Sequence, residues 1–324
     1  MPLTESGDRR RYGDGGQRPA PRIAAVFVAF FPDDRFAHRV AVTSEQVNRV
    51  YIVDNTPAGD PSSVRPTGDL LPSTWPADAL PPGSPAVELL QNGRNLGVAT
   101  ALNQGAQRAM TEGYDLLLMM DQDSSPNSGM VAALERAFRQ WPTRLAIASP
   151  LHLDPHFACG PEPTSERGQA RSMLVTMTAG SLLDLQAYKV LGPFRDDLFI
   201  DQVDHEYCLR AHRRGYDVVQ VGDAVVEHTL GDRTVRFVGG LAVATSNHSA
   251  LRRYYITRNR LIVAREYPDF PSFRRLQRWQ TLGELRNTIL FEKGRRAKLA
   301  MMARGVWDYM RHQTGPLPES QEGV

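Results

Sequence analysis

The sequence predicts an α/β protein with a mostly parallel β-sheet flanked by helices and a helical extension at the C-terminus. Apolar runs of strand length, such as Ile23–Phe31 and Leu116–Met120, alternate with stretches in which apolar residues recur at helical spacing. The alternation begins as strand, helix and strand between Ile23 and Val53. Such a unit places its two strands parallel with a right-handed crossover, which is the basis of the predicted fold class.

The first part of the chain contains two segments that are not expected to form regular structure. Met1–Arg22 is rich in Arg, Gly, Asp and Pro, and we expect it to be a disordered tail. Pro57–Pro85 contains eight prolines, so we expect a surface excursion there. Between these segments, the pattern predicts a strand at Ile23–Phe31, a helix at Arg35–Asn48 and a strand at Val50–Val53.

The alternation resumes after the proline-rich segment. A helix should begin just after Gly97, because its apolar residues recur at i, i+3, i+7 and i+11, and Gly113 should end it. Leu116–Met120 is then too short for a helix and suits a central strand. The further elements that we expect are strands at Ala86–Leu90, Arg144–Ser149 and Met173–Leu185, helices at Pro126–Gln140 and from Val203 to Gly215, irregular chain at His152–Gln169, a strand pair at Asp217–His228 and a helix start at Tyr254–Arg260.

Composition restricts the class of protein. The chain has 324 residues and a formal net charge of +2, which does not indicate a nucleic-acid partner. Its two cysteines, Cys159 and Cys208, form no C-x-x-C motif, which excludes a zinc ribbon or disulfide scaffold and suits a reducing compartment. No apolar run approaches the length of a membrane span, and the N-terminus lacks the apolar core of a signal peptide. We therefore expect a cytoplasmic protein.

The turn after the first predicted strand disfavours two common nucleotide-binding chemistries. A dinucleotide fold would have G-x-G-x-x-G there, and this chain has Phe31-Pro32-Asp33-Asp34. The G-x-x-x-x-G-K-[ST] pattern of a P-loop is absent from the sequence.

Asp121 and Asp123 follow the predicted central strand at a spacing of two. In an extended chain this spacing points both carboxylates to the same side. Ligands of open α/β sheets bind beyond the carboxyl ends of the strands, where two acids can hold a divalent cation and the cation can hold phosphate oxygens. The alternative is an ordinary turn, because Asp123-Ser124-Ser125-Pro126 also suits the entry to a helix.

A second group of acids lies at Phe199–Gly215, where Asp201, Asp204 and Glu206 crowd the first turn of a predicted helix. Two interpretations of this group are open. It is a second chemical centre, or its acids simply cap the helix, because acids in a first turn stabilise a helix by interacting with its dipole. His228 lies at the end of a predicted strand. It is either a structural histidine or a ligand of metal or phosphate.

The segment Arg274–Arg311 has ten Lys or Arg residues and three acids. Two interpretations of this basic amphipathic helical pair stay open: it packs against the rest of the protein with a solvated basic face, or it lies on an anionic membrane surface. The apolar residues at helical spacing are Leu276, Trp279, Leu282, Leu285, Ile289, Leu299, Met302, Val306 and Met310.

Taken in order, these motifs resemble the family 2 glycosyltransferases with a GT-A fold, and among them the rhamnosyltransferase-like members. The resemblance extends from about Ile23 to Arg260 and implies a GT-A domain over residues 23–260, followed by the basic helical region 261–324. The matching pieces are Ile23–Phe31, Val53-Asp54-Asn55, Asn95–Asn103, Asp121-Gln122-Asp123, Thr178–Ser181, Phe199–Asp204 with Arg210, His228–Gly231 and Tyr254-Tyr255-x-x-Arg258-Asn259.

The resemblance also implies roles for individual residues. Asp204 would be the general base, although many relatives have Glu at the position of Val203. Asp121, Asp123 and His228 would hold Mg²⁺ or Mn²⁺ on the diphosphate of a sugar nucleotide. The residues that would bind the nucleotide are Phe30, Asp54, Asn95, Gly97, Asn103, Asp121 and Arg258.

The function implied is inverting, metal-dependent transfer of a sugar to a hydroxyl group in cell-surface polysaccharide synthesis. The donor would be a dTDP- or UDP-sugar, with dTDP-L-rhamnose favoured, and the acceptor an oligosaccharide or lipid-linked saccharide. The location expected from composition is the cytoplasm, and peripheral contact of the C-terminal helices with the cytoplasmic face of the membrane stays one of the two open interpretations of the basic region. Two alternatives stay open, a glycoside hydrolase with two carboxylates and a non-catalytic sugar-nucleotide or membrane-binding module.

Overall fold

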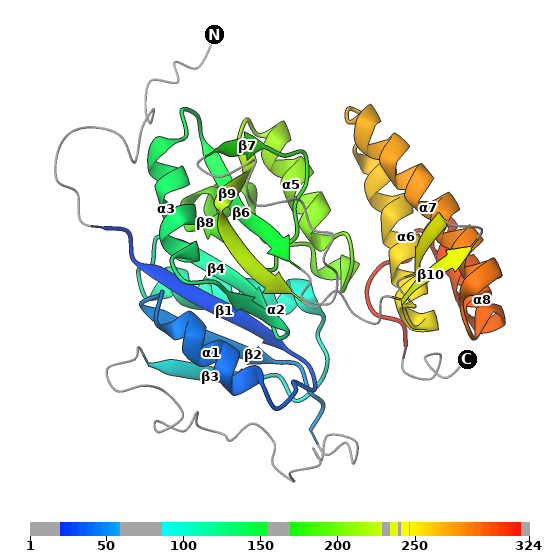
Figure 1. Ribbon diagram of the computed structural model, residues 1–324, viewed down its shortest axis with the longest axis horizontal. Helices are drawn as coiled ribbons and strands as arrows, with labels where there is room; N and C mark the ends of the chain where they lie inside the picture. Colours follow the sequence, from blue (N-terminus) through cyan, green and yellow to red (C-terminus); the bar gives the residue numbers. More distant parts are fainter. Residues whose placement is uncertain are drawn as a thin grey trace. The chain divides into compact units, whose positions relative to one another are not determined.

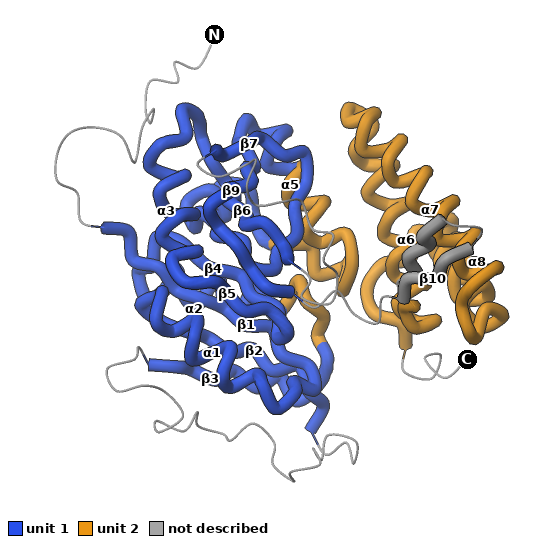
Figure 2. The backbone as a smooth tube through the Cα atoms, in the orientation of Figure 1, with its two compact units in different colours: residues 1–95, 101–193, 210–228 blue, residues 96–100, 194–209, 229–324 orange. Residues whose placement is uncertain are grey.

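The computed structural model describes residues 20–58, 86–153, 169–228, 234–238, 241–245 and 247–318. Most of the expected tail Met1–Arg22, of the proline-rich Pro57–Pro85 and of the stretch His152–Gln169 lies outside these residues. Contacts within the chain define two compact units (Figure 2). The first unit comprises 1–95, 101–193 and 210–228, and the second comprises 96–100, 194–209 and 229–324. The domain boundaries expected from the sequence stay a prediction.

The first unit is built on a sheet whose parallel part follows the predicted strands. β1 (Ile23–Ala29) pairs in parallel with β2 (Arg49–Asp54) on one side and with β4 (Leu116–Asp121) on the other. β3 (Val87–Gln91) extends this group beyond β2, also in parallel. β1 and β2 are almost wholly buried, which explains why they appear in the sequence as continuous apolar runs.

The other strands make the sheet mixed, with nine strands in all among the described residues. β8 (Ser181–Asp184) is antiparallel to both β4 and β6 (Leu145–Leu153), and β9 (Asp217–His228) runs parallel to β6. Two three-residue strands, β5 (Ser124–Pro126) and β7 (Ala170–Ser172), are antiparallel to β9. The predicted α/β class is confirmed.

Helices cover both faces of this sheet. α1 (Phe36–Ser44) and α3 (Met130–Gln140) lie on one face, where their buried side chains join a core with alternate residues of β1 (Figure 1). α2 (Val98–Thr111) packs on the other face, since a Cβ added at Gly105 would lie 2.3 Å from Cγ2 of Val26. Gly105 therefore permits a close helix–strand approach that alanine would prevent. The unit also contains α4 (Leu185–Leu191).

The second unit is mainly helical. It contains α6 (Ala250–Glu266), α7 (Pro271–Phe291) and α8 (Arg295–Met310), together with a hairpin of β10 (Thr234–Val238) and β11 (Leu241–Thr245). α6 and α8 pack closely, because a Cβ added at Gly305 would lie 2.8 Å from the carbonyl oxygen of Tyr254. α5 (Val203–Arg213) begins in this unit and ends in the first.

Four local expectations were wrong. Asp217–His228 is one strand and not a strand pair, because the residues on both sides of Gly222-Asp223 pair in parallel with β6, across a register shift in which β9 carries the extra residues. Met173–Leu185 is not a single strand, since only Ser181–Asp184 within it forms a strand. The third helix begins at Met130 rather than Pro126, because Ser124–Pro126 pairs with β9. Tyr254–Arg260 lies inside α6 and not at its start.

Candidate functional site

The carboxyl ends of the parallel strands bring two predicted acids to one edge of the first unit. Asp54 ends β2 and lies opposite Ala29 of β1, while Asp121 ends β4 and lies opposite Val28. Both acids therefore flank the end of β1, from which the chain continues to Phe30. This is the edge at which open α/β sheets bind ligands.

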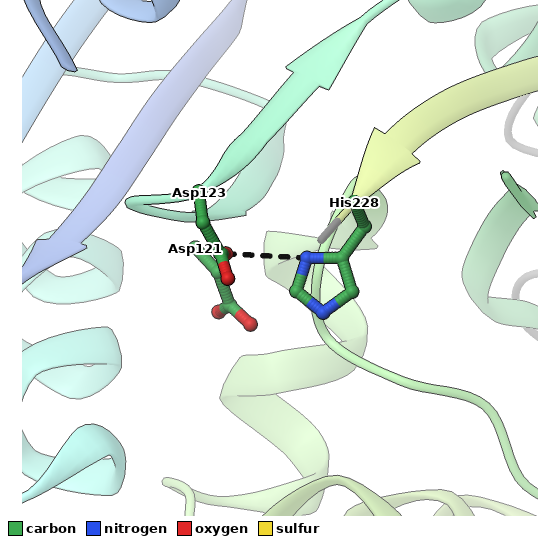
Figure 3. A group of neighbouring side chains, drawn as sticks. All are labelled: Asp121, Asp123 and His228. Carbon is green, nitrogen blue, oxygen red and sulfur yellow. Dashed lines mark ion pairs between the residues drawn. The ribbon is translucent and has the colours of Figure 1, made fainter. Parts of the chain in front are cut away.

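Asp121, Asp123 and His228 form a compact cluster at this edge (Figure 3). Each offers one ligand atom, and these atoms all lie within 4.8 Å of one another. Oδ1 of Asp123 lies 3.2 Å from Nδ1 of His228. Figure 3 shows the two carboxylates and the imidazole ring grouped around a common space. Two carboxylates and one imidazole suit a divalent cation of the Mg²⁺ or Mn²⁺ kind and leave further positions for oxygen ligands.

The short strand β5 creates this cluster. Ser124 pairs with His228 in the antiparallel register of β5 and β9, so the residue before it, Asp123, comes to lie beside the histidine. The buried hydroxyl of Ser124 lies 2.8 Å from Nδ1 of His228 and orients the ring. No pattern in the sequence indicates this role for Ser124, because Asp123-Ser124-Ser125-Pro126 suits a turn.

Gln122, between the two aspartates, fixes the turn from the opposite side. Its side-chain oxygen accepts a hydrogen bond of 2.7 Å from the backbone N–H of Phe30, and its carbonyl oxygen accepts one of 2.9 Å from Arg39. Arg39 donates hydrogen bonds to both carboxylate oxygens of Asp33, and these hydrogen bonds lower the pKa of Asp33. The D-x-D turn is therefore tied to the end of β1 and to α1. No pattern in the sequence indicated this role for Gln122.

The predicted nucleotide-binding residues of the first unit have distinct environments. Phe30 is 41% exposed, as an aromatic ring available for stacking on a base would be. The buried carboxylate of Asp54 accepts a hydrogen bond of 2.9 Å from the N–H of Thr56, which shapes the turn after β2. Asn103 lies on α2, and its side-chain oxygen accepts a hydrogen bond of 2.8 Å from the hydroxyl of Tyr188. Asn95 is exposed in the loop before α2. Their contact with a nucleotide stays a prediction.

Gly97 has a clear structural function in the second unit. Its φ of +85° favours glycine, and an added Cβ would lie 2.6 Å from the carbonyl oxygen of Phe199. The next residue, Val98, donates a hydrogen bond of 2.8 Å to the same oxygen. Gly97 and Val98 therefore pack directly on the segment that precedes Asp204.

That segment is strained. Phe199, Asp201 and Gln202 all have positive φ values, between 62° and 65°, which residues other than glycine adopt at a cost of about 1–3 kcal/mol each. The buried amide of Asn259 holds this loop by donating hydrogen bonds to three carbonyl oxygens, those of Leu198 (2.7 Å), Ile200 (2.7 Å) and Asp201 (3.2 Å).

Asp204 follows this loop in the first turn of α5. It is partly buried, and its Oδ1 accepts a hydrogen bond of 2.8 Å from the N–H of His205. Burial raises the pKa of the neighbouring Asp201, against the lowering effect of Arg252. Glu206 is buried and accepts a hydrogen bond from Tyr267, so its function is structural. Asp204 belongs to the second unit, and its convergence with Asp121 and Asp123 stays a prediction.

Arg258 is buried within the second unit. Its guanidinium donates hydrogen bonds to the side chain of Asn259, to the hydroxyl of Tyr254 and to the carbonyl oxygen of Gly315. These contacts show that Arg258 supports the residue that holds the strained loop. The contact with a diphosphate expected from the resemblance stays a prediction.

Comparisons with solved structures identify the fold. S. aureus TarS (residues 1–349) in complex with UDP-GlcNAc superposes with a TM-score of 0.54 at 10% sequence identity, covering 90% of this chain and 81% of that one. GalNAc-T7 with UDP, GalNAc and Mn²⁺ gives a TM-score of 0.50 at 13% identity, covering 92% of this chain and 59% of that one. The chain has the GT-A fold of glycosyltransferases.

A sequence comparison finds a sugar transferase. The dTDP-rhamnosyl transferase RfbF of Shigella flexneri is 29% identical to this chain over 193 residues, which cover 56% of the chain and 64% of that protein's length. No protein-family model matches the chain. The resemblance to rhamnosyltransferase-like family 2 enzymes, inferred from the motifs, is confirmed by this relative.

Proposed function

We propose that the protein is an inverting, metal-dependent glycosyltransferase that moves a sugar from a nucleoside diphosphate to a hydroxyl group of a saccharide. The observation that carries the proposal is the cluster of Asp121, Asp123 and His228 at the carboxyl edge of the GT-A sheet. A bound divalent cation would neutralise the charge that develops on the diphosphate leaving group. The imidazole ligand favours Mn²⁺ over Mg²⁺.

The protein's own residues have separate tasks in this proposal. Asp121, Asp123 and His228 would hold the cation, which would supply positive charge to the diphosphate, and Phe30 and Asp54 would hold the base. Asp204 accepts the proton of the acceptor hydroxyl as the oxygen attacks the anomeric carbon. One base and one cation suffice for a single displacement with inversion, and no covalent enzyme intermediate is required.

The name of the relative RfbF supports dTDP-L-rhamnose as the donor. UDP-sugars are the second candidates, because the similar structures of TarS and GalNAc-T7 contain UDP-GlcNAc and UDP. The acceptor in this proposal is an oligosaccharide or a lipid-linked saccharide of the cell surface, and the reaction takes place in the cytoplasm.

The donor can be identified by thermal unfolding of the full chain with dTDP-L-rhamnose, UDP-GlcNAc or UDP-GalNAc, each with Mn²⁺ or with EDTA. Ligand that binds only the folded state at 100 times its dissociation constant stabilises it by about 2.7 kcal/mol. We expect one donor to raise the unfolding temperature in Mn²⁺ and to lose most of this effect in EDTA. If no nucleotide sugar stabilises the protein in either condition, the proposal is wrong.

The base is tested separately with Asp204→Asn, and Asp201→Asn is the matched control from the same loop. We expect Asp204→Asn to keep the cation-dependent donor shift and to lose transfer activity, while Asp201→Asn retains activity. Near-normal turnover of Asp204→Asn would exclude this residue as the base. Hydrolysis of a simple glycoside in EDTA would instead support a two-carboxylate hydrolase.

A further inference from the structure

Helix α7 of the second unit has its amphipathic faces reversed relative to an ordinary surface helix. Its large apolar side chains point outward: Trp279 is 68% exposed, Leu290 60% and Leu282 58%. Leu276 and Ile289 are exposed as well. At 100° per residue, all five fall within one sector of the helix, which is the pattern of an apolar face without a partner among the described residues.

The inward face of α7 makes ion pairs and hydrogen bonds with α6. Glu284 accepts hydrogen bonds of 2.9 and 3.0 Å from Arg260 of α6. Arg260 also donates a hydrogen bond to the hydroxyl oxygen of Thr281. Arg253 of α6 lies 3.3 Å from Glu284. The buried residues of α7 are Phe273, Gln277 and Thr288. These ion pairs determine the rotation of α7, and the apolar stripe expected from the sequence is left facing outward.

Arginines are interleaved with the outward apolar residues. Arg275 and Arg286 fall in the middle of the apolar sector by helical periodicity, and Arg278 lies at its edge. All three are exposed. The sector contains no acid, because Glu284, the only acid of α7, points inward. An exposed surface that combines tryptophan, leucine and arginine without acids is complementary to an anionic lipid surface.

We propose that the outward face of α7, formed by Arg275, Leu276, Arg278, Trp279, Leu282, Arg286, Ile289 and Leu290, docks the protein on an anionic membrane surface. The helix lies in the plane of the interface, with its apolar side chains among the acyl chains and its arginines at the headgroups. No helix among the described residues is long and apolar enough to cross a membrane. The proposal does not depend on sugar transfer.

The test is co-sedimentation of the full chain with vesicles of phosphatidylcholine alone or of phosphatidylcholine with 30% phosphatidylglycerol. We expect binding to the anionic vesicles, weakened by salt, and little binding to the neutral ones. Arg275→Gln with Arg286→Gln should weaken binding roughly thirty-fold, since two basic residues are lost from the surface. Trp279→Gln with Leu282→Gln should reduce it roughly tenfold or more.

Matched variants control for general effects. Arg136→Gln with Arg214→Gln removes the same charge from exposed positions of the first unit, and Val190→Gln changes an apolar residue that is 56% exposed there. Both should bind the anionic vesicles as the wild type does. The cation-dependent donor shift, measured on every variant, separates a failure of docking from a failure of the proposed function.

Two outcomes would overturn the proposal. One is equal binding of the α7 variants and the controls to anionic vesicles, or no binding by any of them. The other is a wild-type dimer, measured by light scattering, that the α7 variants convert to monomers without any change in vesicle binding. That result would assign the face to a second copy of the chain.

Discussion

The hydroxyl of Ser124 and the Asp123 carboxylate share one ring nitrogen, Nδ1 of His228, at 2.8 and 3.2 Å. The ring therefore presents to the carboxylates the same nitrogen that the hydroxyl contacts. A cation bound by Asp123 and by Nδ1 would displace the hydroxyl, because a nitrogen that donates its lone pair to a metal cannot also accept a hydrogen bond.

The first prediction follows from this sharing. His228→Asn should weaken Mn²⁺ binding roughly tenfold or more, because it removes a ligand that the fold holds in place. Ser124→Ala should leave the affinity within about threefold, because the hydroxyl yields its position when the cation binds. Both are measured by Mn²⁺ titration of the donor-dependent thermal shift. A loss of tenfold or more in Ser124→Ala would contradict this, and would show that the other ring nitrogen is the ligand while the hydroxyl orients the ring from Nδ1.

The second prediction concerns Gly97. Gly97→Ala places a Cβ 2.6 Å from the carbonyl oxygen of Phe199, in addition to the cost of a positive φ. Gly215→Ala is the control, because Gly215 has a φ of +73° and no atom within 4 Å of an added Cβ. Gly215→Ala should cost about 1 kcal/mol of unfolding free energy and retain activity. Gly97→Ala should cost about 2–4 kcal/mol and reduce turnover. If urea unfolding shows that Gly97→Ala and Gly215→Ala lose the same unfolding free energy, the packing described for Gly97 is contradicted.

The third prediction concerns Asn259. Asn259→Asp keeps the shape of the side chain and replaces three hydrogen bonds to carbonyl oxygens with repulsion. Unfolding free energy should fall by about 2–4 kcal/mol. Turnover should fall more than donor affinity does, because the loop before Asp204 loses its support. Asn287→Asp, the same substitution on α7, is the control and should alter neither quantity appreciably. A variant with normal stability and a normal ratio of turnover to donor affinity would refute this role.

The fourth prediction is a pH dependence of stability. Burial, together with the charges of Arg252 and Arg253, lowers the pKa of His248 to about 4, and Glu292 and Lys298 also act on it. Between pH 4 and 6.5 the unfolded chain binds the proton and the folded chain does not, so stability is lost as the pH falls through this window. Given the partial exposure of the ring, we expect a loss of about 1–2 kcal/mol in the wild type beyond that in His248→Gln. If the unfolding free energies of the wild type and His248→Gln change in parallel between pH 4 and 6.5, the lowered pKa of His248 is contradicted.

The parts of the site that follow from periodicity were predictable from the sequence. β1, β2 and β4 are buried on both faces, so their apolar runs were evident, and the acids that end β2 and β4 fall at one edge for any parallel arrangement of these strands. β5 was not predictable, because a three-residue strand of Ser-Ser-Pro resembles a turn. Its pairing with β9 depends on a strand about a hundred residues later in the chain.

The orientation of α7 was equally beyond sequence patterns. The apolar stripe was evident, but which face turns inward depends on Glu284 meeting Arg253 and Arg260 of another helix. The usual rule that the apolar stripe faces the core would have given the opposite answer. Likewise, the Gly222-Asp223 pair inside β9 resembles a hairpin turn, and only the pairing with β6 shows that the strand continues.

The two aspartates of the D-x-D motif are carried by elements of very different strength. Asp121 ends a central strand with neighbours on both sides, whereas Asp123 depends on a three-residue strand that local fraying can open. A cation bound between them would stabilise the pairing of the short strand β5 with β9, in addition to its proposed part in the reaction. Loading the metal should therefore slow amide hydrogen exchange at the β5–β9 pairing while leaving β4 unchanged, and the catalytic ion would itself complete the sheet that binds it.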